Sequence, residues 1–171
     1  MSLDHKQAPY AQACLAYSQA NIQRLGTPGH QADENMFSRL RDVFSKDVLE
    51  LDIPMLTDGV DYGSSPTPLE QSRALAADAW GARKTWFLTN GASQGNQLAC
   101  LVLGSLGQSI VLQRSMHSSI IDGLAFSGMA AHYVMPSVDP YLGVPNGITP
   151  SQLSAALIDA THGKKKIAAA Y

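Results

Sequence analysis

The run of small and polar residues from Asn90 to Gly95 is the part of this sequence best suited to bind an anion. It follows an apolar segment, 85–89, that we expect to form a buried strand, and it precedes a helix expected over 96–103. Unpaired backbone N–H groups and the helix dipole at such a junction attract phosphate or carboxylate groups. Ser93 adds a hydroxyl donor. The segment therefore predicts an anion site, and the alternative is a tight turn that Ser93 caps.

The residues Gly91 to Gly95 also match the G-x-S-x-G pattern of a hydrolase nucleophile elbow. In that interpretation Ser93 attacks an acyl carbon and His162 is the base, oriented by Asp139 or Asp159. A hydrolase elbow normally follows several strands, and the preceding residues, 1–84, contain no clear strand pattern. The pattern favours anion binding and leaves a serine hydrolase as an alternative.

His117 is the next residue with chemical potential. It follows an expected strand, 110–113, and precedes a helix expected over 118–127. Neighbouring strand ends of a parallel sheet meet at one edge, so we expect His117 to lie near Ser93. The flat ring could stack on an aromatic cofactor, or the histidine could hydrogen-bond locally as a cap. His30, in a Pro-Gly-His turn, is a weaker candidate.

Helices and strands alternate along the second part of the chain. Capping-box patterns predict helices that start after Thr67 and Thr149 and end near Trp80 and Thr161. Apolar runs predict four strands, at 85–89, 110–113, 131–135 and 167–171, and helical patterns lie near the N-terminus at 9–25 and 35–44. This order predicts an α/β fold with a parallel sheet that helices cover on both faces.

Charge is unevenly distributed. Residues 1–84 hold 19 of the 26 charged residues, and none lies between Thr85 and Gln113, as is typical of elements buried on both faces. This contrast predicts an exposed arm followed by a core. The net charge of −2 gives no positive field for nucleic acid or for an anionic membrane. With two cysteines and no leader or spanning pattern, we expect a cytoplasmic protein without a metal site.

Four motifs together resemble the Orn/Lys/Arg decarboxylase family of fold type I pyridoxal-phosphate (PLP) enzymes. They occur in family order at 27–30, 89–97, 114–119 and 127–128, and the resemblance extends from about Gly26 to Tyr171. It implies a partial, three-layer, PLP-transferase-like large domain behind a helical N-terminal arm. It also implies that Ala92, Ser93 and Gln94 hold the cofactor phosphate and that His117 stacks on the pyridine ring.

The chain departs from the family's usual sequence at several positions and lacks some of the family's motifs. The family usually has lysine where Gln31 and Ser118 stand, and often threonine at Ala92, which implies a divergent branch. Family members carry the Schiff-base lysine in a Ser-x-His-Lys motif beyond the fourth strand, after the aspartate that pairs with the pyridine nitrogen. This chain contains no such motif, so no catalytic residue is assigned to it. The early position of Thr27 implies the short form of the family, without a wing domain.

The resemblance thus implies the N-terminal portion of a PLP-dependent decarboxylase of arginine, lysine or ornithine, in polyamine metabolism. Residues 1–60 would be the arm and residues 61–171 the first half of the PLP-binding large domain, inactive alone. Expected partners are the amino-acid substrate, the remainder of the large domain and a second copy in a homodimer. The alternatives are another fold type I enzyme such as an aminotransferase, a serine hydrolase using Ser93, and a non-catalytic phosphate-binding module.

Overall fold

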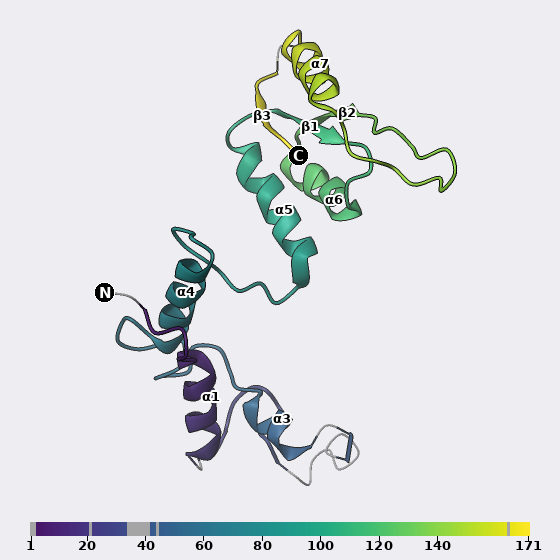
Figure 1. The fold of residues 1–171 in the computed structure, drawn as a ribbon. Helices are drawn as coiled ribbons and strands as arrows, with labels where there is room; N and C mark the ends of the chain where they lie inside the picture. The colour runs from purple at the N-terminus through teal and green to yellow at the C-terminus, as the bar shows by residue number, and fades with distance from the viewer. Residues whose placement is uncertain (1–2, 21, 34–41, 44, 164) are drawn as a thin grey trace. The chain divides into compact units, whose positions relative to one another are not determined.

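The computed structural model describes residues 3–20, 22–33, 42–43, 45–163 and 165–171 (Figure 1). The chain divides into two compact units, Met1–Phe87 and Leu88–Tyr171. The sequence placed the end of the N-terminal arm at residue 60, before this division. The assignment of residues 61–87 to a cofactor-binding domain stays a prediction.

A parallel sheet forms the centre of the second unit. Its strands β1 (Ser109–Gln113), β2 (Ala130–Val134) and β3 (Ile167–Ala170) lie in the order β2-β1-β3, and both pairings are parallel. The first four residues of the central strand are fully buried, as its continuous apolar sequence predicts. The predicted parallel α/β architecture is confirmed for this unit.

Helices cover both faces of the sheet. They are α5 (Gly91–Gly104), α6 (Ser118–Ser127) and α7 (Pro150–Thr161). Side chains alternate along β1, so Ile110 and Leu112 pack into the cluster formed with α5 and α6, whereas Val111 packs with Val134 and with Ala160 of α7. Figure 1 shows α5 and α6 side by side on one face and α7 on the other. Three layers result, as predicted.

The predicted capping boxes are present. The Thr149 hydroxyl accepts a hydrogen bond from the Gln152 N–H (3.2 Å), and the Gln152 side chain accepts one from the Thr149 N–H (2.7 Å). Thr67 and Glu70 make the same exchange at the start of α4 (Pro68–Ala79). Hydrogen bonds from the Ser65 hydroxyl and then from the Thr67 N–H lower the pKa of Glu70. Each helix starts where its sequence satisfies the first backbone donors.

The predicted strand at 85–89 is wrong. This segment has no regular secondary structure and pairs with no described strand, and Trp86, Phe87 and Leu88 are 63%, 50% and 42% exposed. Apolar sequence favours a strand, yet a strand also needs a neighbour for its backbone hydrogen bonds, and this segment pairs with none of the described strands. The turn expected at 90–95 is also wrong, because α5 begins at Gly91.

The first unit is helical and has a small core. It contains α1 (Pro9–Gln19), α3 (Lys46–Leu51) and α4. α1 ends before Leu25, where the pattern had placed its end, and the Tyr10 N–H joins it to the Ser72 hydroxyl of α4 (3.0 Å). Val60 and Ala77 are the buried apolar residues described in this unit. The helix expected at 35–44 lies mostly outside the described residues, and no described helix is long and apolar enough to span a membrane.

Candidate functional site

The start of α5 is open to a ligand. Gly91 has a φ of 70°, a left-handed conformation that favours glycine, and a Cβ there would meet nothing within 4 Å. Among the described residues, no side chain caps this helix. The first N–H groups of α5, on Gly91, Ala92 and Ser93, are therefore available to an anion.

The Gln94 side chain has a structural role, and the phosphate-binding role that the resemblance implies for Gln94 stays a prediction. Its side-chain oxygen accepts a hydrogen bond from the Asn90 N–H (3.2 Å), so it folds back over the residue that precedes the helix. Ser93 is half-buried in the first turn of α5. The three predicted residues Ala92, Ser93 and Gln94 thus belong to one helical turn, in which Gln94 stabilises the turn and the other two present donors.

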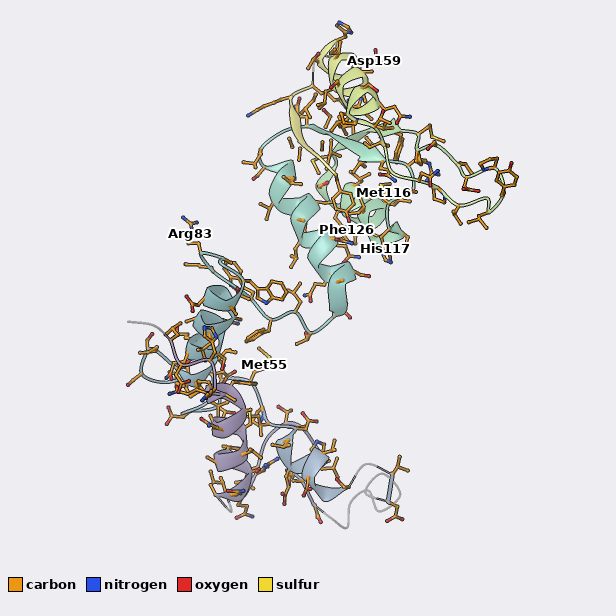
Figure 2. All side chains as sticks on the ribbon, viewed as in Figure 1. Met55, Arg83, Met116, His117, Phe126 and Asp159 are labelled. Atoms are coloured by element: carbon orange, nitrogen blue, oxygen red, sulfur yellow. The ribbon has the colours of Figure 1, made fainter. Side chains whose placement is uncertain are left out.

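His117 is the N-cap of α6, directly after the segment that follows β1 (Figure 2). Its Nδ1 accepts a hydrogen bond from the Ser119 N–H (3.2 Å) and lies 2.8 Å from the Ser119 hydroxyl oxygen. The local capping role left open by the sequence is therefore present. Capping uses only Nδ1, and His117 is exposed. The ring faces and Nε2 remain available, so stacking stays a prediction.

The two helix starts lie at the same end of the unit because α5 and α6 run parallel in a fixed register. The Asn96 amide donates to the Ser119 hydroxyl (2.8 Å), and the pair is 23 residues apart in sequence. Two further close approaches keep this separation and are four residues apart along each helix: Cys100 against Gly123, and Gly104 against Ser127. If the same register is extended by one turn towards the start of both helices, the start of α5 lies next to the segment that leads into His117. Figure 2 shows His117 on the side of the unit from which α5 also starts.

The sequence analysis did not single out Asn96 or Ser119. The signal that could have found them is the spacing of small residues at every fourth position on both helices, at 96, 100 and 104 and at 119, 123 and 127. Small residues in the same helical row let two backbones approach closely, which brings short polar side chains within hydrogen-bonding distance.

The residues of the hydrolase alternative are not brought together. Ser93 lies inside a regular helical turn, and the positive φ of this segment belongs to Gly91. The Asp139 carboxylate accepts hydrogen bonds from the Leu142 and Tyr141 N–H groups, which lower its pKa, so it stabilises its own loop. Among the described residues, no hydrogen bond joins Ser93 to a histidine or to an aspartate. The described residues therefore show no hydrogen-bonded nucleophile and base at Ser93.

His30 is held within the first unit. Its Nε2 lies 3.0 Å from an Asp52 carboxylate oxygen, and its Nδ1 accepts a hydrogen bond from the Ala32 N–H (3.1 Å). Both ring nitrogens are engaged, which indicates a structural role for the Pro-Gly-His turn.

A cavity of about 380 Å³ in the first unit is a second place where an anion could bind. Arg73, Arg83, Lys84 and Trp86 line it, together with Glu70, which is committed to its capping box. The Arg73 Nε is buried without a hydrogen-bond partner among the described residues. This cavity lacks the small, uncapped helix start of α5, but its cations make it the natural competitor for a phosphate group.

The second unit is a parallel α/β unit in which two adjacent helices begin at one end, and helix N-termini in such folds are common places for anionic ligands. The chain belongs to the Orn/Lys/Arg decarboxylase family, because the model of that family's major domain matches residues 8–169.

Three relatives illustrate the similarity. The chain is similar to the arginine decarboxylase of Halalkalibacterium halodurans, 27% identical over 152 residues that cover 89% of this chain and 31% of the relative. The arginine decarboxylase of Bacillus anthracis is 26% identical over 162 residues, covering 95% of this chain and 33% of the relative. The lysine decarboxylase of Hafnia alvei is 24% identical over 160 residues, covering 88% and 21%. The chain spans about a third or less of the length of these relatives.

Proposed function

We propose that this chain supplies the phosphate-binding and ring-binding part of a PLP-dependent decarboxylase that acts on arginine, lysine or ornithine. The observation that carries the proposal is the pair of adjacent helix starts, one uncapped at Gly91 and one capped by His117. Family membership and the names of the relatives support the reaction and the substrate class.

The residues at the start of α5 suit the phosphate of PLP. Successive N–H groups aim along the helix axis, and the dipole of a 14-residue helix favours a negative group there. Gly91 presents no side chain, so a phosphate can approach the backbone closely. Asn96, whose amide is hydrogen-bonded to the Ser119 hydroxyl beside His117, follows Gly91 by five residues, or about 7.5 Å of helical rise. That span suits a short ligand with a phosphate at one end and a flat ring at the other.

Each residue then has a defined task. The N–H groups of Gly91, Ala92 and Ser93 and the Ser93 hydroxyl hold the phosphate, while Gln94 keeps the turn in shape. The His117 ring packs against the face of the pyridine and excludes water from it. When bound, PLP supplies the electron-poor ring that accepts the electron pair released as CO2 leaves.

The remaining chemistry is proposed to come from elsewhere in the protein. Residues 85–163 contain no lysine, so neither α5 nor α6 can provide the covalent link to the cofactor. We place that lysine and the acidic partner of the pyridine nitrogen in the remainder of the large domain. Apolar side chains on α5 and α6 that are 44–64% exposed offer surface for that remainder and for a second copy of the protein: Leu98, Leu101, Val102, Ile121 and Phe126.

Ser93→Ala is expected to weaken PLP binding by about 1–3 kcal/mol, the scale of a charge-assisted hydrogen bond, and to leave some activity at saturating cofactor. Fluorescence titration of the intact protein with PLP measures the change. Ser105→Ala is the matched control, because this exposed hydroxyl lies at the other end of α5 and donates to the Val102 carbonyl. Covalent labelling of Ser93 by a fluorophosphonate would instead favour the hydrolase alternative.

The reaction is tested by incubating the intact protein with arginine, lysine or ornithine labelled in the carboxyl carbon. We expect labelled CO2 from one of the three, dependent on added PLP and much reduced with pyridoxal, which lacks the phosphate that α5 is proposed to bind. If amino-group transfer to a 2-oxo acid occurs without CO2 release, the protein is an aminotransferase and the proposed reaction is wrong.

A further inference from the structure

We propose that the side chains of Asn96 and Ser119 are positioning groups that fix the orientation of the His117 ring. The inference rests on the proposed function, in which His117 packs against the cofactor, and it identifies what holds the ring in place.

The three side chains form a continuous hydrogen-bonded path from α5 to the ring. The Asn96 amide donates to the Ser119 hydroxyl oxygen at 2.8 Å, and that oxygen lies 2.8 Å from the His117 Nδ1. The Ser119 N–H also donates to the same nitrogen at 3.2 Å. Ser119 is only 2% exposed, so water does not compete for its hydroxyl. The path is built from one half-buried residue of α5 and one buried residue of α6.

The direction of these hydrogen bonds determines where the protons lie. A backbone N–H can only donate, so the His117 Nδ1 that faces the Ser119 N–H must be an acceptor. The neutral ring therefore carries its proton on Nε2. Because the Asn96 amide already donates to the Ser119 oxygen, the hydroxyl proton is free to point at Nδ1. Asn96 thus orients the hydroxyl, and Ser119 orients the ring.

The path also connects the two halves of the candidate site. α5 holds the phosphate through its first turn, and the amide of Asn96, less than one turn further along, leads to the ring through Ser119. Nε2 and the ring faces are the parts of His117 left for a ligand, since Nε2 bonds to no residue in the described parts of the chain. We expect a ring that is held in this way to meet the cofactor without first losing rotational freedom.

A double-mutant cycle on the intact protein tests the inference. Ser119→Ala keeps the backbone donor and the close packing but removes the hydroxyl, and we expect the dissociation constant for PLP to rise about three- to tenfold. Asn96→Ala should act in the same direction. His117→Phe keeps a flat ring without Nδ1, so Ser119→Ala should cause no further loss in that background. An equal loss in both backgrounds would show that Ser119 does not act through His117.

A second measurement needs no cofactor. The Ser119 N–H is retained in Ser119→Ala and Asn96→Ala, so the Nε2–H tautomer should persist in both variants. NMR relaxation spectra of the His117 ring should instead show a more mobile ring in both variants than in the unmodified protein. Unchanged ring spectra in both variants would overturn the inference even if PLP binds as proposed. If the spectra change as expected but none of the variants affects PLP binding, the ring is positioned as inferred and the proposed stacking role is wrong.

Discussion

Gly123→Ala is expected to lower the free energy of unfolding by about 1–3 kcal/mol, although alanine normally stabilises a helix relative to glycine. A Cβ at this position would lie 2.7 Å from both Cβ and Sγ of Cys100 and 3.3 Å from Cα of Gln97. Because the Gln97 Cα belongs to the backbone of α5, the two helices would have to move apart to make room for the Cβ. Denaturant unfolding of the purified protein measures the loss.

The control for this change is Phe126→Ala on the same helix, where the side chain is 63% exposed. It should alter the stability by much less. Because the close approach of α5 and α6 also holds the Asn96–Ser119 hydrogen bond, Gly123→Ala should weaken PLP binding as well. If Gly123→Ala stabilises the protein, as in an isolated helix, the close packing of the two helices described above is wrong.

His117→Asn is expected to keep the stability of the fold but to lose affinity for PLP. His117→Phe is expected to lose stability but to keep more of that affinity. Asparagine is a preferred N-cap, so it can still accept the Ser119 N–H, whereas phenylalanine removes a cap worth about 0.5–2 kcal/mol. Phenylalanine keeps an aromatic face, so its variant should bind PLP more tightly than the asparagine variant by about 0.5–1.5 kcal/mol. Thermal unfolding and PLP titration of the two variants separate capping from stacking.

The result that would contradict the stacking role is equal loss of PLP affinity in the two His117 variants. His117 would then act through its ring nitrogens. Unchanged PLP binding in both variants would leave only the capping role that the structure shows.

Local sequence was sufficient to predict most elements of the second unit. α6 was predicted with its observed bounds, because a polar segment precedes its apolar pattern and Gly128, with a φ of 68°, ends it. α7 was predicted from the capping box at Thr149, and β1 from its continuous apolar run. In each case the residues that determine the element lie within or next to it.

The predictions that were wrong or missed depend on distant partners. The apolar segment at 85–89 has the composition of a strand, but pairing depends on which strands are adjacent in space. The Asn96–Ser119 contact depends on the register between two helices, which a list of candidate residues does not contain. The small residues at the start of α5 are a local property that the sequence displays, and the anion site proposed there stays a prediction. The hydrogen bond from the Asn90 N–H to the Gln94 side chain was not predicted, because the sequence analysis expected a turn there and not the first turn of a helix.

The central claim is that the start of α5 holds the phosphate of PLP while His117 faces the ring, and a crystal structure of the intact protein grown with PLP tests it most directly. We predict phosphate oxygens within about 2.7–3.2 Å of the N–H groups of Ala92 and Ser93, with the pyridine ring parallel to the ring of His117. Phosphate density in the cavity lined by Arg73 and Arg83, with the start of α5 free of ligand, would contradict the account.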